Sequence, residues 1–368
     1  MRSKDFLYEE VYSDIRQKIM SGHYQPDDRL PGEDELSQEY HASRITIKRA
    51  LDMLREDGLV RRVQGKGTFV MGLEDMRPAA PMEQRKESRL VGIVLEHVSS
   101  PFGLEMMYRM IRLLEEQNYK TCVRFTFGDI RKETEEINDL LSMHICGLII
   151  MPCHDSYYNM TILKLILEHF PVVLVDKQMS GLPVSSIYTD GSGAVKALVH
   201  KLRERGAKNA ALITIDPSSA SSLGDRVEGF YKGLEETGIG NMGELILPRR
   251  TGDWIFEKRS ENYITAIEGF LRSMDPLPEG IVCTEYSTAR ALLETSRQMH
   301  LELGVDTLAC CIDENPNSTA EVFFSHMHQD EAEIARKAVE VLLTLLRNGQ
   351  VSQMQIKVPA IYIEGRSL

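Results

Sequence analysis

The chain has 368 residues, of which 42% are hydrophobic and 27% are charged, and its formal net charge is −12. This length favours two to three domains, each large enough to bury its own core. The acidic balance excludes a protein that coats nucleic acid nonspecifically. The sequence has no export signal at its start and no run of about 18 apolar residues, so we expect a cytoplasmic protein without a membrane partner.

Cysteine usage points to a reducing compartment. The six cysteines are scattered and none forms a Cys-x-x-Cys pair; they are Cys122, Cys146, Cys153, Cys283, Cys310 and Cys311. Five of them fall in or beside apolar runs. We therefore expect buried thiols rather than disulfides or metal ligands, and we predict no metal site and no cofactor.

The N-terminal region predicts three helices in an informative order. Apolar periodicity indicates helices over 6–21 and 33–40, and a longer amphipathic helix over 43–57. A tight turn at His41-Ala42 joins the second helix to the third, and Ser43 stands where an N-cap residue belongs. Cations and hydroxyls near the start of the third helix are typical of a helix that enters the DNA major groove.

A short hairpin is expected after these helices. Strands are predicted over 59–63 and 68–70, joined by a Gln-Gly-Lys-Gly turn. Glycines in such a turn let the backbone approach phosphate closely, as in a DNA-binding wing. Between residues 44 and 66 there are seven Lys or Arg and three acidic residues, so positive charge gathers here although the whole chain is acidic.

From Leu30 to Val70 the sequence resembles the winged helix-turn-helix of the GntR family of transcription regulators, almost position by position. The resemblance implies that the partner is double-stranded DNA. Where the family commonly has an arginine in the second helix this chain has Asp34, and His41-Ala42 replace Gly-Val. The positions expected to contact DNA are Ser43, Arg44, Thr46, Lys48, Gln64, Gly65 and Lys66 from the resemblance, with Arg49 added.

A linker separates this domain, expected over 1–71, from the rest. Residues 72–88 contain two prolines and no apolar periodicity. Over 89–368 short apolar strands alternate with helices, which predicts a parallel sheet covered on both faces. The alternation starts again after about residue 189, so we expect two doubly wound lobes with a ligand cleft between them.

Polar side chains follow several of the predicted strands. Carboxylates, an arginine and amides at strand ends suit a hydroxyl-rich ligand, because each can donate or accept hydrogen bonds in pairs. Asp190 and Glu285 also fit as caps of the helices that follow them, and Trp254 fits either a stacking platform for a sugar or a packing role. The residues predicted to bind an effector are Asp176, Lys177, Arg226, Thr284, Glu285, Asp313 and Gln329.

The order of motifs VDKQ, YTDGSGA, DRVEGF, CTEYSTARAL, CIDE and HMHQD resembles the effector domain of the LacI/GalR family over about 89–368. The resemblance implies a periplasmic-binding-protein-like fold, chain crossings near 189 and 327, dimerisation through this domain and a small effector, often a sugar. Lys177 and the pair Thr284-Glu285 depart from the family pattern. A GntR-like head on a LacI-like domain is similar to the class of arabinose-responsive repressors.

The fold class expected is therefore multidomain, with an α+β winged helix-turn-helix and a two-lobed α/β domain. The function expected is sequence-specific transcription regulation: a homodimeric repressor of carbohydrate-utilisation genes, controlled by a monosaccharide and nucleoid-associated when bound to its operator. The alternative is the same architecture with a purine, nucleoside or phosphosugar effector. An enzyme is not expected, because Gly-x-Ser-x-Gly and His-Glu-x-x-His motifs are absent.

Overall fold

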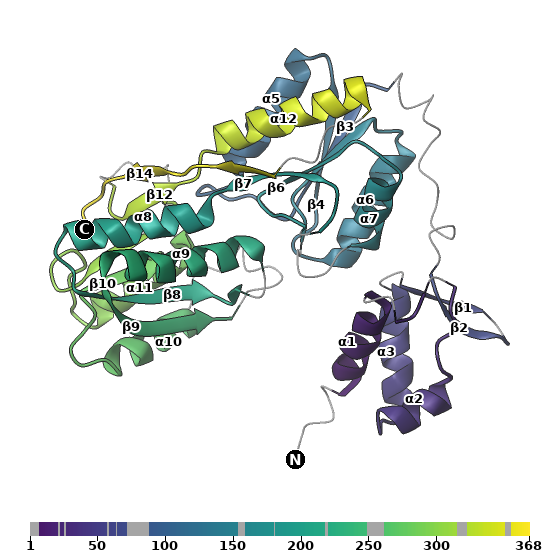
Figure 1. Ribbon diagram of the computed structural model, residues 1–368, viewed down its shortest axis with the longest axis horizontal. Helices are drawn as coiled ribbons and strands as arrows, with labels where there is room; N and C mark the ends of the chain where they lie inside the picture. The colour runs from purple at the N-terminus through teal and green to yellow at the C-terminus, as the bar shows by residue number, and fades with distance from the viewer. Residues whose placement is uncertain are drawn as a thin grey trace.

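The computed structural model describes most of the chain, as an N-terminal domain followed by two α/β lobes (Figure 1). The described residues are 7–20, 23–25, 27–56, 59–63, 65–71, 88–153, 159–179, 181–217, 220–248, 261–314, 322–349 and 355–368. The expectations for Gln64, Trp254 and residues 72–87 of the linker lie outside them.

The N-terminal domain has three helices and a hairpin, as the sequence predicted. They are α1 (Leu7–Met20), α2 (Glu33–Glu39), α3 (Arg44–Glu56), β1 (Val60–Val63) and β2 (Gly67–Val70). The hairpin strands are antiparallel. The apolar stripe of α3 forms the centre of the core: Ile47, Ala50 and Leu54 are fully buried, against Val11 and Ile15 of α1.

The turn between α2 and α3 explains why the GntR pattern has glycine there. His41 adopts φ 48°, in the left-handed region that glycine enters freely. A non-glycine residue in this region costs about 1 kcal/mol. The turn is held nonetheless, because the hydroxyl of Tyr40 donates to Asp14 of α1 and accepts from Lys18 at 3.0 Å.

The first lobe, called the N-lobe, is a parallel sheet in the order β13-β7-β6-β5-β3-β4. Its strands are β3 (Leu90–Leu95), β4 (Lys120–Phe125), β5 (Gly147–Ile150), β6 (Val172–Val175), β7 (Ser185–Thr189) and β13 (Gln355–Val358). Helices cover both faces (Figure 1). One face carries α5 (Leu104–Glu116) and α12 (Glu331–Asn348); the other carries α6 (Ile130–Ser142) and α7 (Met160–Leu167).

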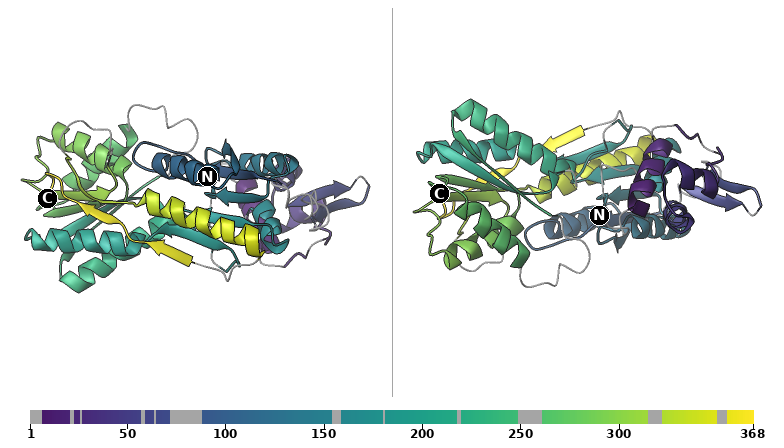
Figure 2. Two further views of the ribbon diagram at one scale, coloured as in Figure 1. Left: turned by 90° about the horizontal axis from the view of Figure 1, so that it is seen from above. Right: turned by 90° about the horizontal axis from the view of Figure 1, so that it is seen from below.

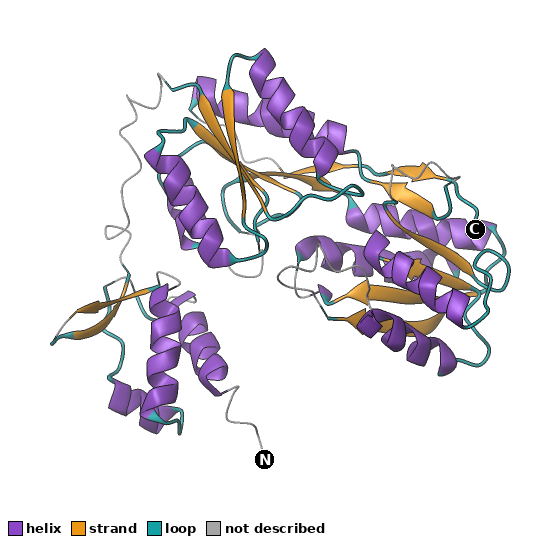
Figure 3. Cartoon of the chain, turned by 180° about the vertical axis from the view of Figure 1, so that it is seen from behind, coloured by secondary structure: helices purple, strands orange, loops and turns teal. Residues whose placement is uncertain are grey.

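The second lobe, called the C-lobe, has a sheet in the order β14-β12-β11-β10-β8-β9, with only the β12–β14 pair antiparallel among its described strands (Figure 3). The strands are β8 (Asn209–Ile215), β9 (Gly240–Leu247), β10 (Gly280–Cys283), β11 (Leu308–Ile312), β12 (Ser325–His328) and β14 (Ile361–Ile363). One face carries α8 (Gly191–Glu204) and α9 (Ser221–Thr237); the other carries α10 (Glu261–Arg272) and α11 (Tyr286–Gln298).

The chain passes between the lobes more than once. Within the described residues it crosses at 189–191, at 328–331 and at 358–361, where the sequence had suggested crossings near 189 and 327. As a result α12 lies in the N-lobe although the C-terminus lies in the C-lobe (Figure 2). Short crossing segments of this kind let two lobes move as rigid bodies about a hinge.

The cysteines are free, and all but Cys122 are buried. Burial raises the pKa of the Cys146 thiol to about 11 and that of Cys283 to about 12, which disfavours the reactive thiolate. The prediction of buried thiols is confirmed for these residues. In the part of the chain that the structure describes, no helix is both long and apolar enough to cross a lipid bilayer.

Candidate DNA-reading surface and effector cleft

The start of α3 presents hydroxyls and cations. The Ser43 hydroxyl accepts the backbone N–H of Thr46 at 3.2 Å, which confirms Ser43 as the N-cap residue. The hydroxyls of Ser43 and Thr46 also share a hydrogen bond at 2.8 Å. Arg44 and Lys48 are exposed beside them. This end of the helix therefore offers donors and acceptors to a partner without any loss of core packing.

Two of the predicted DNA-contacting arginines already have partners within the domain. Arg44 forms an ion pair with Asp34, the residue that departs from the GntR pattern, and both side chains are well exposed, at 72% and 65%. The guanidinium of Arg49 lies over the ring of Tyr8 in α1, 4.0 Å from its centroid. In the free protein, Arg44 is therefore exposed but paired with an acid, and Arg49 packs against α1.

The wing places a cation at its tip. Val63 pairs with Gly67 at the end of the ladder, and Gly65 and Lys66 are exposed in the turn between them. Gly65 and Gly67 have φ of 75° and 119°, which suits glycine and explains their presence. Gln64, also predicted to contact DNA, lies outside the described residues.

The positive charge of Arg226 acts on two carboxyls, one in each lobe. Asp176 follows β6 in the N-lobe, Arg226 lies in α9 of the C-lobe, and Asp313 follows β11. Burial raises the pKa of both carboxyls, and the positive charge of Arg226 acts on each in the opposite direction. Asp176 and Asp313 both have left-handed backbones, with φ of 67° and 59°, which turns the chain sharply at each strand end.

Arg226 is positioned by the end of β10. It is 7% exposed, and its Nη1 donates to the carbonyl oxygen of Thr284 at 2.9 Å. The hydroxyl of Thr284 points to Thr214, 3.0 Å away, and the residue is fully buried. Thr284, predicted to bind effector, is therefore placed to hold the guanidinium, and its own hydroxyl does not face the cleft.

Asp313 and Gln329 bind each other. The backbone N–H and the side-chain amide of Gln329 donate to the two carboxylate oxygens of Asp313, at 2.9 and 2.7 Å. Gln329 lies in the crossing segment at 328–331, so this pair attaches that segment to the end of β11. Asp313 and Gln329 are thus bound to each other, and the charge of Arg226 acts on Asp313 and on Asp176.

Asp190 and Glu285 both precede helices, but only the Asp190 side chain caps its helix. Asp190 caps α8, since its carboxylate accepts the N–H of Gly193 at 3.2 Å. Glu285 occupies the N-cap position of α11 without a side-chain capping bond, and its carboxylate accepts the hydroxyl of Ser287 at 3.2 Å. Glu285 is half-buried at the end of β10, next to Thr284.

Lys177, predicted to bind an effector, makes its contacts inside the N-lobe. Its ammonium forms a buried ion pair with Glu96, and it donates to the carbonyl oxygens of Pro152 at 2.7 Å and Cys153 at 3.3 Å. Lys177 and Glu96 are each about 4% exposed. Three acceptors satisfy the three N–H donors of an ammonium, so we assign Lys177 to holding the ends of β3 and β5 together rather than to contacting an effector.

Glu96 is the partner of Lys177 that the sequence prediction missed. It directly follows the apolar strand β3, which is the same signal that singled out Asp176 after β6. A buried charge requires an opposite charge nearby, and a buried lysine after one strand therefore implied an acid after another. In the described residues, no group of three or more His, Cys, Asp or Glu side chains is arranged to hold a metal ion.

Comparisons with known proteins match both parts of the chain. Residues 7–70 match the gntR family of bacterial regulatory proteins, and residues 199–368 match the periplasmic binding protein-like domain. The chain is 25% identical over 352 residues to the arabinose metabolism transcriptional repressor of Geobacillus stearothermophilus, covering 94% of this chain and 93% of that protein. The protein of the same name from Halalkalibacterium halodurans is also 25% identical, covering 92% and 89%.

A solved structure supports the fold of the two lobes. The transcription regulator CcpA of Lactococcus lactis superimposes with a TM-score of 0.65 at 18% identity, covering 76% of this chain and 99% of that one. The family matches indicate a transcription regulator rather than an enzyme. They also agree with the GntR and LacI-like resemblances that the sequence motifs carried.

Replacing Asp34 tests whether it restrains Arg44. We expect Asp34→Ala to bind DNA more tightly than the wild type, because it frees Arg44 and removes an anion that repels phosphate. Asp34→Arg should add a phosphate contact and steepen the slope of log K against log salt by about one. The measurement is fluorescence anisotropy on a duplex selected by the protein from a randomised library.

Asp52→Ala is the matched control, because Asp52 also pairs with an arginine of α3, Arg55, but at the opposite end of the helix. It should leave affinity unchanged. Weaker binding by Asp34→Ala would contradict the prediction and would mean that the carboxylate orients Arg44 for base recognition.

Replacing Lys177 tests its assignment as a structural residue. Lys177→Met removes the buried ammonium that pairs with Glu96, and loss of one member of a buried ion pair should destabilise the lobes by about 3–5 kcal/mol. Calorimetric unfolding of the full chain measures this loss. The double variant Lys177→Met with Glu96→Gln should recover part of it, since glutamine removes the buried negative charge together with the positive one. A stable Lys177→Met protein would restore the prediction that this lysine contacts the effector.

Proposed function

Because the chain joins a gntR-type regulatory domain to a periplasmic-binding-protein-like domain, we propose that it represses carbohydrate-utilisation genes and that a small sugar in the cleft controls its operator binding. The observation that carries the proposal is the combination of an exposed cationic helix start at α3 with the charged constellation Asp176–Arg226–Asp313 between two lobes. The similarity to two arabinose metabolism repressors along nearly the whole chain supports it.

On the DNA side, α3 enters the major groove with its N-terminus first. Ser43, Arg44, Thr46 and Lys48 then face base edges and phosphates, and Lys66 at the wing tip faces the backbone. The ion pair of Arg44 with Asp34 opens on binding, since both side chains are exposed and the pair is weak in water. The protein then works in the bacterial cytoplasm and is associated with the nucleoid when it is bound to its operator.

On the effector side, the charge balance favours an uncharged ligand. The sequence predicted two cations at the effector site, Lys177 and Arg226. The Lys177 ammonium already donates to Glu96 and to two backbone carbonyls. The remaining one, Arg226, already faces the carboxylates of Asp176 and Asp313. Hydroxyl groups can donate to these carboxylates and accept from the guanidinium, whereas a phosphate would be repelled by both carboxylates. This favours a free sugar over a phosphosugar.

Control of DNA binding follows from the two-lobed design. A sugar that contacts Asp176 from one lobe and Arg226 from the other stabilises one relative position of the lobes. The crossing segments at 189–191, 328–331 and 358–361 absorb the movement. Operator affinity then changes only to the extent that the sugar binds the two arrangements differently.

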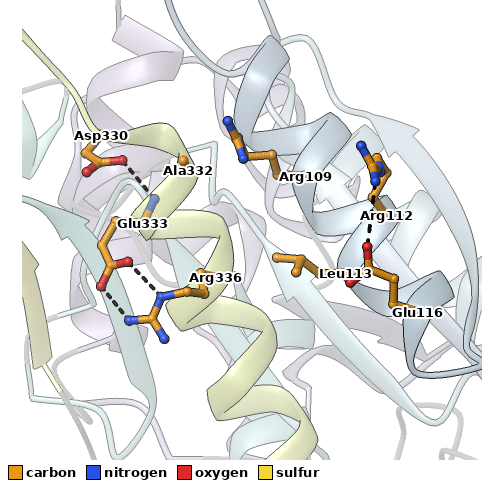
Figure 4. A pocket seen from close by; sticks show the side chains of 8 residues that line it. All are labelled: Arg109, Arg112, Leu113, Glu116, Asp330, Ala332, Glu333 and Arg336. Carbon is orange, nitrogen blue, oxygen red and sulfur yellow. Dashed lines mark hydrogen bonds and ion pairs between the residues drawn. The ribbon is translucent and has the colours of Figure 1, made fainter.

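We further propose that the active form is a homodimer that contacts itself through the α5–α12 face of the N-lobe. Leu104 and Tyr108, one helical turn apart on α5, are 43% and 64% exposed. A groove is lined by α5 and by the start of α12 with charged side chains of both signs (Figure 4). Arg112 pairs with Glu116 and Arg336 with Glu333. A surface that carries both signs is self-complementary under two-fold symmetry.

The cleft prediction is tested with Arg226. A thermal-shift panel of pentoses, hexoses, their phosphates and nucleosides should give a hit among free sugars, and a ligand at about 100 times its Kd should stabilise the lobes by roughly 2.7 kcal/mol. Arg226→Ala should abolish that shift and operator release but retain operator binding. Arg44→Ala should do the reverse.

Arg226→Lys controls for loss of folding, because it keeps the charge and removes the planar fork; we expect weakened sugar binding with the unfolding transition retained. A shift from a phosphosugar, purine or nucleoside in the absence of any sugar response would keep the regulator and replace the effector. An Arg226→Ala protein that sugar still releases from DNA would contradict the cleft assignment.

The dimer surface is tested with Tyr108. Tyr108→Asp places a charge in the proposed contact and should raise the dimer dissociation constant at least about tenfold by analytical ultracentrifugation. Val305→Asp, at a 72% exposed position of the C-lobe, is the matched control and should sediment as the wild type. A dimeric Tyr108→Asp protein would contradict this surface, and a monomeric wild type would contradict the dimer.

A further inference from the structure

One apolar side chain stands out on the DNA-reading helix. Ile45, the second residue of α3, is 82% exposed, the highest value among the exposed large hydrophobic residues that the structure describes. The other aliphatic positions of this helix face the core: Ile47, Ala50 and Leu54 are fully buried and Leu51 is 5% exposed. Ile45 therefore contributes nothing to the packing of the domain.

The neighbours of Ile45 on the surface are polar. Arg44 precedes it, Lys48 lies one turn further along, and both are exposed. Ser43 and Thr46 satisfy each other through their hydroxyl hydrogen bond. A β-branched residue is also a poorer helix former than alanine, lysine or arginine. Neither packing nor helix propensity explains an isoleucine at this position.

Isolated exposed hydrophobic residues are common on protein surfaces, so exposure alone assigns no role. The position of Ile45 is what matters. It lies in the first turn of α3, the part of a helix-turn-helix that meets base edges in the major groove. The base edges there present one apolar group, the C5-methyl of thymine, alongside hydrogen-bond donors and acceptors.

We propose that Ile45 contacts a thymine methyl in each operator half-site and so sets the base preference at one position. The inference rests on the proposed function, since it requires α3 to occupy the major groove. Arg44 and Lys48 on either side then supply the polar contacts to neighbouring bases and phosphates. A methyl contact then favours thymine at that position by a few-fold, because thymine alone of the four bases carries a methyl group on its major-groove edge.

The experiment replaces thymine by deoxyuridine, which removes only the methyl group. The full-length protein first selects a duplex from a randomised library. That duplex is then synthesised with deoxyuridine at each thymine of one half-site in turn, and Kd is measured by fluorescence anisotropy. For the wild type, one position should weaken binding about three- to fivefold, the effect expected for burial of one methyl group.

The Ile45→Ala variant completes a double-mutant cycle with the replacement of thymine by deoxyuridine. It should weaken binding to the thymine duplex by a similar factor and should bind thymine and deoxyuridine duplexes equally at that position. Folding is not at risk, because the side chain is exposed and alanine favours the helix. Val305→Ala is the matched control for removal of an exposed branched side chain, and it should discriminate as the wild type does.

Two outcomes would overturn the inference while leaving the regulator in place. They are an Ile45→Ala protein that keeps full discrimination between thymine and deoxyuridine, and a wild type that binds its selected duplex tightly but is indifferent to the methyl at every position. Failure to enrich or bind any duplex would overturn the proposed function itself and this inference with it.

Discussion

One guanidinium acts electrostatically on carboxyls of both lobes. Arg226 projects from the C-lobe, is fixed there by the carbonyl of Thr284, and acts on the carboxyls of Asp176 in the N-lobe and Asp313 in its own. All three groups are at least partly removed from water, where charge interactions are stronger than on the surface. Under the proposed function, a sugar bound beside these groups would change the electrostatic attraction between the lobes and thereby their relative position.

Asp313 is also bound to the crossing segment at 328–331. Gln329 lies in a crossing segment and donates twice to Asp313, so the segment cannot shift without disturbing the carboxylate beside Arg226. Immediately after it, buried Glu331 accepts the N–H groups of Gly103 and Met106 at 2.9 and 2.8 Å, at the start of α5. A continuous chain of hydrogen bonds therefore runs from the cleft to the helix that we propose as the dimer contact. In the proposed homodimer, this connection would link effector binding to the spacing of the two DNA-reading domains.

Positive charge gathers between residues 44 and 66 of an otherwise acidic chain. The chain is acidic as a whole, yet the start of α3 and the wing present exposed cations. Within the N-terminal domain several of these cations have local acids: Asp34 beside Arg44, Glu33 beside Arg62, and Asp27 beside Arg61. Such pairs reduce nonspecific attraction to DNA and leave discrimination to contacts made in the groove.

The sequence by itself determined the elements, their order and the families they resemble, since apolar periodicity and capping residues such as Ser43 and Asp190 act within a few residues of chain. It also singled out Asp176, Arg226, Asp313 and Gln329 as candidate effector-binding residues. Only the tertiary structure decided where the Lys177 ammonium and the Thr284 hydroxyl point. Their partners, Glu96 and Thr214, are 81 and 70 residues away in the chain. Strand-end position says that a side chain reaches the edge of a sheet, but its direction depends on which distant groups the fold brings beside it.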